Sequence, residues 1–403
     1  MESIEGGFTP LPSASALRFN GRFPTERFRN MKPEDSALLR HAVNKVNEEI
    51  RKGFLSKQDR GETGKALLMA MDEAIGLSNE LAPGDHKWFL TETTRRHRVR
   101  RKMMAKIRRT HLRRWGRGFI LFDDALAASE VLNAAIEDTI GRWTLENEPS
   151  IKKEYLLGVK EILGGQARKC LLLLSLHSRA CSIANEIRLL VEHGFPEAVK
   201  ARTRSLHELA VIALALNVHG QADTSVSDRY GAWTLAEARK EARAIAARGG
   251  TPEPLDELEA DLERRAAATW GGDFFRQNGW AAPLFPGRRP PIPFNEIEQR
   301  VNMEHMRDYY MAGNDAIHAG PSALMNRLRL RNGSVFPTVS EVQHETVRNF
   351  AAVAVMTLSD LGATACRAVA SITQDFDLLC GIKVIRDFED LAVSEFRNDG
   401  MRA

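Results

Sequence analysis

The sequence has few cysteines and few aromatic residues, and both shortages narrow the folds it can adopt. Only four cysteines occur in 403 residues, and no CxxC pair is present. Neither a zinc site nor a disulfide framework is expected, and a reducing compartment is indicated. Aromatic residues make up 7% of the chain, and β-branched residues are sparse beside Ala, Leu, Arg and Glu, so an all-β fold is disfavoured. With 43% hydrophobic and 27% charged residues, the chain has the composition of a folded globular protein.

Targeting and membrane signals are also missing. The N-terminal MESIEGGFTPLPSAS has no basic region followed by an apolar run, so it is not a secretory signal. No apolar run approaches the roughly 20 residues that a membrane-spanning helix needs. We therefore expect a soluble, cytoplasmic, α-helical protein without a membrane partner.

The motifs of the large enzyme classes do not occur. The sequence has no Walker A motif, no GxGxxG after a strand, no HExxH, no EF-hand loop and no GxSxG elbow. Its histidines do not group at metal-ligand spacing. We expect no cofactor and no bound metal ion.

Positive charge, in contrast, is concentrated in one segment. Residues 95–117, called the basic stretch below, hold twelve Lys or Arg and no Asp or Glu. Because the whole chain has a net charge of +4, the remaining residues together carry −8. Like charges on one helix repel each other, so a counter-surface is expected. Nucleic-acid phosphate is one candidate, and an acidic face of the same protein or of a twin subunit is the other.

Three regions are expected along the chain. Residues 1–34 are rich in Pro and Gly and are predicted to form an irregular arm. Residues 35–148 form an N-terminal helical region with the basic stretch, and residues 149–403 form a helical bundle domain. Within that domain, residues 278–294 hold five prolines and are predicted to form a structureless, functional loop.

Apolar periodicity and breakers place the helices. Gly194 and Pro196 separate two long apolar segments, which predicts an antiparallel helical hairpin at the core of the bundle. A loop containing Pro337 is expected before the last long helix, which Ser340 and Gln343 open as a capping box. The helices are expected over 35–52, 64–81, the basic stretch with a break near 116–118, 119–145, 150–193 as one or two helices, 197–217, two pieces within 225–265, 295–318 and 340–373.

Polar residues on these apolar helices are the candidate site. Arg204 and Glu208 are four residues apart on one helix. Tyr310, Asn314 and His318 form one stripe on another. A base, an acid and a cation suffice for ribonuclease chemistry without a metal. The alternative is structural, with Arg204–Glu208 as a helix salt bridge and His318 as a helix cap. We take Arg204, Glu208, Asn314 and His318 as candidate catalytic residues, and Arg202, His207, Tyr310 and Asp315 as candidate substrate contacts.

Basic residues of the helix at 95–117 are the candidate phosphate contacts. Trp115 is interleaved with them and could either stack on a base or pack into the core. The residues assigned to binding here are Arg100, Arg101, Arg108, Arg109, Arg113 and Trp115.

The segment IANEIRLLVEHGFPEAVKARTRSLHELAVIALAL resembles the core hairpin of a bacterial all-helical family known only as a domain of unknown function. The likeness extends over about 170–325 and includes Arg204, Ser205, Leu206 and Glu208. A later helix with Tyr310 ends at His318, Gly320 and Pro321, and completes the pattern.

That family is similar in layout to HEPN-type helical domains, many of which are RNA-cleaving toxins or defence effectors that act as dimers with a composite Arg/His site. The usual signature places Arg, four to six residues, then His in a late helix. Here Asn314 precedes His318 by four positions, whereas Arg202 and His207 have the required spacing in an earlier helix. The resemblance implies an all-α, HEPN-like fold.

We expect a protein that acts on RNA, with metal-independent cleavage in bacterial stress or phage defence as its activity. RNA or another nucleic acid and a second copy of the chain are the expected partners. The alternative is a non-enzymatic interaction module whose basic helix docks on an acidic partner or a twin subunit. A small-molecule or nucleotide sensor that uses 278–294 as a lid is a third possibility.

Overall fold

The computed structural model describes residues 83–147, 165–220, 222–250, 257–318, 328–331, 334–337 and 344–398, with isolated positions 44 and 69. The chain divides into two compact units, Met1–Ala105 and Lys106–Ala403, and the contacts described below lie within the second unless stated. The predicted helices at 35–52 and 64–81, the arm at 1–34 and the capping box at 340–343 lie outside the described residues.

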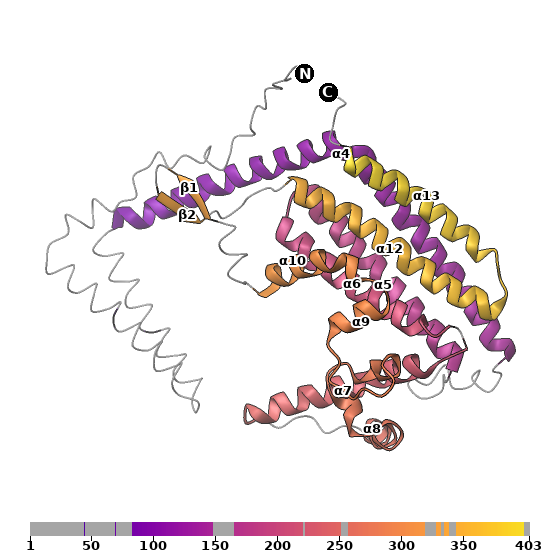
Figure 1. Ribbon diagram of the computed structural model, residues 1–403. Coiled ribbons are helices and arrows are strands. Elements are labelled where there is room, and N and C mark those ends of the chain that lie inside the picture. The colour runs from indigo at the N-terminus through magenta and orange to yellow at the C-terminus, as the bar shows by residue number, and fades with distance from the viewer. Residues whose placement is uncertain are drawn as a thin grey trace, which may run out of the picture. The chain divides into compact units, whose positions relative to one another are not determined.

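The described residues are almost entirely helical, so the predicted all-α, multi-helix bundle is confirmed (Figure 1). The α-helices are α4 (Pro83–Asn147), α5 (Gly165–His193), α6 (Pro196–Asn217), α7 (Ser225–Ala247), α8 (Glu257–Trp270), α9 (Phe294–Arg300), α10 (Arg307–His318), α12 (His344–Thr373) and α13 (Leu378–Arg397). Short 3-10 turns are η3 (Gly272–Phe275), η4 (Gly279–Leu284) and η5 (Glu304–Met306), and the strands are β1 (Leu328–Arg331) and β2 (Ser334–Pro337).

The α5–α6 hairpin forms the centre of the bundle, as predicted. Gly194 has a positive φ of 73°, and its N–H donates to Val191 while that of Phe195 donates to Leu190. This is the Schellman end of a helix, which only glycine adopts at little cost. Pro196 then opens α6, so α6 returns along α5.

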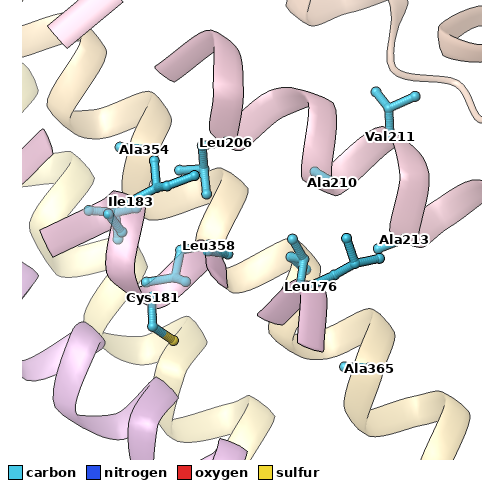
Figure 2. Close-up of a cluster of buried hydrophobic side chains, with 14 of the residues drawn as sticks. Leu176, Cys181, Ile183, Leu206, Ala210, Val211, Ala213, Ala354, Leu358 and Ala365 are labelled. Atoms are coloured by element: carbon cyan, nitrogen blue, oxygen red, sulfur yellow. The ribbon is translucent and has the colours of Figure 1, made fainter. Parts of the chain in front are cut away.

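Helix α12 covers the hairpin and completes the core. Its inward face is built from small and branched residues, which lets it pack closely on α5 and α6. Leu358 of α12 lies near Ile183 of α5 and Leu206 of α6, and each of the three side chains is at most 2% exposed (Figure 2). Although α12 is long and apolar enough to cross a membrane, 83% of its apolar window is buried in the bundle. It therefore fits the core helix of a soluble protein.

Helix α4 is continuous in extent but kinked. Trp115 has non-helical angles (φ −127°, ψ 22°), so the predicted break near 116–118 is a kink one residue earlier. Past the kink, α4 packs against α13 through Phe119 and Phe122, whose rings meet Phe396 edge-on. Three cysteines of the bundle are buried and Cys380 of α13 is exposed.

The Pro-rich segment 278–294 is not the structureless loop that the sequence predicted. It begins with η4, and Trp280, Leu284 and Ile292 are at most 3% exposed. Arg229 of α7 donates two hydrogen bonds to the carbonyl of Gly279. Aromatic and aliphatic side chains between the prolines fix the segment against α7, so the expectation of a structureless loop is wrong.

Two further expectations need correction. The single helix predicted over 295–318 is divided into α9, η5 and α10, because Asn302 takes a left-handed φ of 59° and Met303 turns into the core. Part of the predicted loop before α12 is an antiparallel hairpin, with Leu328 of β1 opposite Pro337 of β2.

Candidate functional site

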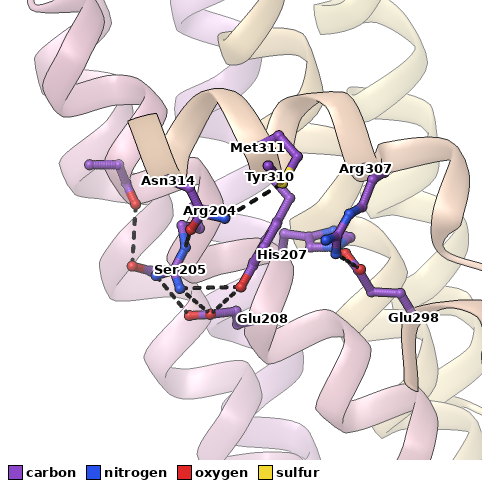
Figure 3. A network of polar contacts seen from close by, with 10 residues as sticks. Arg204, Ser205, His207, Glu208, Glu298, Arg307, Tyr310, Met311 and Asn314 are labelled. Carbon is purple, nitrogen blue, oxygen red and sulfur yellow. Dashed lines mark hydrogen bonds and ion pairs between the residues drawn. The ribbon is translucent and has the colours of Figure 1, made fainter. Parts of the chain in front are cut away.

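Four predicted site residues meet between α6 and α10. Arg204 donates from Nε to Oδ1 of Asn314 and from Nη2 to the hydroxyl of Tyr310 at 3.2 Å (Figure 3). Its Nη2 also lies 2.9 Å from Oε1 of Glu208. The Tyr310 hydroxyl donates to that carboxylate at 3.2 Å. We call Arg204, Glu208, Tyr310 and Asn314 the Arg204 cluster.

A glycine brings the two helices close enough for this cluster to form. A Cβ at Gly313 would lie 2.5 Å from Cβ of Arg204 and 2.8 Å from the carbonyl oxygen of Lys200. Any side chain at this position would separate α10 from α6. The close approach places Tyr310 and Asn314, one turn apart, on either side of the guanidinium.

Three side chains pack on the Tyr310 ring. The guanidiniums of Arg204 and Arg307 lie 4.9 and 5.2 Å from its centroid. Phe294 stacks on it with centroids 5.4 Å apart. The ring is 7% exposed, and burial raises the pKa of its hydroxyl, an effect that the Glu208 carboxylate strengthens.

Partial burial also sets the protonation of Glu208. Desolvation raises the pKa of its carboxyl, and the Arg204 charge and the Tyr310 hydrogen bond oppose that shift. The side chains of Arg204 and Glu208 are 20% and 30% exposed, so solvent reaches both. The pair offers a cation next to a carboxyl that holds its proton more tightly than an exposed glutamate does.

His207 belongs to a separate, buried group on the other side of Tyr310. Its Nε2 lies 2.8 Å from Oε1 of Glu298, and Arg307 pairs with the other oxygen of that carboxylate. The side chains of His207 and Glu298 are 3% and 1% exposed. The expected substrate contact by His207 is therefore wrong, because no substrate reaches an imidazole sealed in this way.

Glu298 and Arg307 were not among the candidate residues. No local pattern indicates them, because Glu298 is 91 positions from its partner His207. Its neighbours in the sequence do not distinguish it from an exposed glutamate. The burial of Ile297 and Val301 beside it becomes visible only when α9 is packed.

The remaining candidates around α6 and α10 do not join the Arg204 cluster. Arg202 pairs instead with Glu186 of α5. Asp315 and His318 are exposed, and His318 lies one turn beyond Asn314 on the same face of α10. Within the part of the chain that is described, His318 makes no hydrogen bond or ion pair.

All twelve Lys and Arg side chains of the basic stretch are exposed. Glu92 pairs with Arg95 and Arg96. Glu192 and Glu395 pair with Arg108 and Arg117 respectively. The described part of α4 and the bundle thus supplies acidic partners at both ends and at one middle position.

Trp115 points away from this cationic surface. It is 3% exposed, and its ring lies 4.9 Å from that of His111 and 6.4 Å from that of His344. Of the two alternatives, packing in the core is the observed one. The assignment of Trp115 to base stacking is corrected, since its faces are occupied.

Within the described residues, no three His, Cys, Asp or Glu side chains come together as a metal site.

No curated protein and no solved structure matches the chain. Residues 171–335, which include α6, α10 and the whole Arg204 cluster, match a family of unknown function (DUF5677), so the expected likeness to an uncharacterised domain family is confirmed for this part of the chain.

Proposed function

We propose that the protein acts on RNA as a metal-independent ribonuclease. The basic stretch holds the phosphate backbone and the Arg204 cluster, with His318, provides the reacting groups. In this proposal the bundle has a HEPN-like layout and the protein works in the cytoplasm of a bacterium, in stress or phage defence.

Support for RNA binding comes from the exposed cations of α4. Arg100, Arg101 and Arg113 are exposed, and among the described residues they have no carboxylate partner. Several such side chains on one helix release counterions when they meet phosphate, which supplies affinity. Acidic residues of this chain pair with only part of the positive charge of the basic stretch.

The chemistry assigns one role to each group. Arg204 supplies positive charge for the phosphorane, and Glu208, whose pKa is raised by burial, supplies a carboxyl that exchanges a proton. His318, exposed on the same face of α10 as Asn314, supplies the second acid–base group. Asn314 and Tyr310 keep the guanidinium in place and act as positioning residues.

Salt dependence tests the binding half of the proposal. We expect the affinity for a short single-stranded RNA to fall with rising salt, at about 0.7 logarithmic units per phosphate contact. The triple variant Arg100→Gln/Arg101→Gln/Arg113→Gln is expected to lower that slope by about 2. Arg243→Gln, which changes an exposed arginine on α7, is the matched control. Absence of binding at about 50 mM salt, where such contacts are strong, would contradict the proposal.

Cleavage in the presence of EDTA tests the catalytic half. His318→Ala is expected to abolish RNA cleavage without affecting the fold, because the side chain is exposed. His219→Ala, an exposed histidine beyond the end of α6, is expected to remain active. Equal activity in both variants, or no cleavage by folded wild-type protein, would remove the enzymatic proposal.

A non-enzymatic interaction module is the second candidate. Arg204 is already engaged by Glu208, Asn314 and Tyr310, which favours a network that fixes α10 on α6. This candidate predicts that Arg204→Gln lowers stability while partner binding persists in the fraction that remains folded. Cleavage that disappears with His318→Ala would exclude it.

A further inference from the structure

An apolar groove runs between α4 and α13, on a face that the Arg204 cluster does not use. It has a volume of about 710 Å³. Its apolar lining comes from Ala128, Val131, Leu132 and Ala135 of α4 and from Val384 and Phe388 of α13.

Antiparallel packing of the two helices creates the groove. Asp375, just before α13, lies beside Thr139 and Arg142, while Phe396 near its end meets Phe119. Between these points, Gly381 lets the helices approach, because a Cβ there would lie 2.9 Å from Cδ1 of Leu132. Leu132 thus forms the floor of the groove. The short side chains of Ala128 and Ala135 leave the groove open on its α4 side.

The walls expose side chains that a bundle normally covers. Val131 is 71% exposed and Val384 is 46% exposed, and they face the same groove from opposite helices. A continuous apolar surface with a polar edge is typical of a docking site, unlike scattered surface valines.

The edge of the groove is acidic. Asp124, Asp138 and Asp377 line it, and none of them has a cationic partner among the described residues. Among the described lining residues Arg142 is the one cation, and it lies 3.7 Å from Asp375. Within the described part of the chain, a ligand that covers the apolar floor therefore meets carboxylates of α4 and of the start of α13 that have no cationic partner.

These features select the occupant. A trough between two helices accommodates a third amphipathic helix, whose apolar residues at i, i+3 or i+4 and i+7 enter it. Its flanks must carry Lys or Arg, because the edge is acidic. The same groove of a second copy does not fit, since it would bring one aspartate edge onto another.

The basic stretch of a second copy does not fit either. From Ile107 onward its inward face includes Ile107, His111 and Trp115, which are buried in its own bundle. That part of the helix therefore has no free apolar face to insert.

We propose that the α4–α13 groove binds a cationic amphipathic helix of a partner protein. Such a helix buries Val131 and Val384 and pairs its Lys or Arg side chains with Asp124, Asp138 and Asp377. This surface is separate from the residues assigned to RNA, so it would exist whether or not the protein cleaves RNA.

Synthetic peptides test the proposal on the full-length protein. The probe is a Leu/Lys amphipathic helix of about 18 residues, which matches the length of the α4 segment along the groove. A Leu/Glu peptide with the same apolar pattern and a scrambled Leu/Lys peptide are the comparison probes. Affinities are measured by fluorescence anisotropy.

We expect the Leu/Lys helix to bind the wild-type protein and the two comparison peptides to bind about tenfold more weakly or worse. Val131→Lys/Val384→Lys is expected to reduce that binding by about tenfold or more, since it places cations in the contact. Ile120→Lys/Leu391→Lys changes exposed apolar residues of the same two helices outside the groove lining and is expected to bind as the wild type does.

Three outcomes would overturn the proposal. Equal binding of the Leu/Glu helix would show that the acidic edge does not select the partner. Unchanged binding by Val131→Lys/Val384→Lys would place the peptide elsewhere. A wild-type dimer in sedimentation that this double variant dissociates would show that a second copy fills the groove.

Discussion

Gly313 of α10 lies so close to Arg204 of α6 that the space for a methyl group between them is already occupied. The absence of a side chain at Gly313 therefore determines where the Arg204 guanidinium is held. The hydrogen bonds from Arg204 to Asn314 and Tyr310 depend on this contact, so the geometry of the cluster and the packing of α10 are coupled.

Gly313→Ala is expected to lower the free energy of unfolding by about 1–3 kcal/mol, because the added methyl overpacks the contact between helices. Urea denaturation measures the change. Gly141→Ala is the matched control, since a Cβ at this helical glycine of α4 meets no atom within 4 Å. That control should be neutral or stabilising by up to about 1 kcal/mol, and equal losses in both variants would contradict the proposed contact.

Tyr310→Phe is expected to lower the free energy of unfolding by about 1 kcal/mol, because it removes the hydroxyl that joins Arg204 to Glu208. A double-mutant cycle with Glu208→Gln measures the coupling. We expect an interaction free energy of about 0.5 kcal/mol or more between the two positions. Strict additivity would mean that the hydroxyl and the carboxylate do not interact in solution.

His207→Ala is expected to destabilise the protein by about 3 kcal/mol or more, because it takes a hydrogen-bond donor from a buried carboxylate and leaves a cavity. Among the described side chains, Glu298 would then be paired with Arg307 alone, whose side chain is 37% exposed. Thermal and urea unfolding provide the measurement. A loss below about 0.5 kcal/mol, the range of ordinary surface substitutions, would show that the pair contributes little.

Stability is expected to fall between pH 6.5 and pH 4. Burial lowers the pKa of His111 to about 4; the hydrogen bond to Val191 opposes this shift, and the neighbouring His344 and Arg114 add to it. The unfolded chain has a histidine pKa of about 6.5, so it binds more protons than the folded protein within this window. The contribution, about 3 kcal/mol, is fully present above pH 6.5 and is lost as the pH falls towards 4.

His111→Gln tests this pH dependence, since glutamine keeps a donor near the carbonyl oxygen of Val191, which His111 Nδ1 approaches at 2.8 Å. The variant should lose less stability than the wild type between pH 7 and pH 5 in urea unfolding. His177, buried with a pKa of about 4, keeps part of the dependence in the variant. An exposed control, His219→Gln, should behave as the wild type does.

Local chemistry made the helical core predictable. The Gly194–Phe195–Pro196 turn was identified from residue types, because a left-handed end followed by a first-turn proline leaves few alternatives. The four-residue spacings of Arg204 with Glu208 and of Tyr310 with Asn314 correctly indicated shared faces. Their meeting depends on Gly313, whose role required both helices to be packed.

The errors arose where long-range packing overrode composition. Five prolines in 278–294 indicated a structureless loop, yet Trp280 and Ile292 are buried in the bundle. Trp115 and His207 were candidates for ligand contact on residue type, and tertiary structure enclosed both. Glu298 was missed for the converse reason, because a buried carboxylate has no local signature until its partners are placed.

The distribution of the cysteines has a practical consequence. Burial raises the pKa of Cys181 and Cys366 to about 12, and Cys170 is also buried, so these thiols should react slowly with maleimides. Cys380 is exposed and precedes Gly381 at the groove. A dye attached to this native thiol would report on helix docking in the unmutated protein.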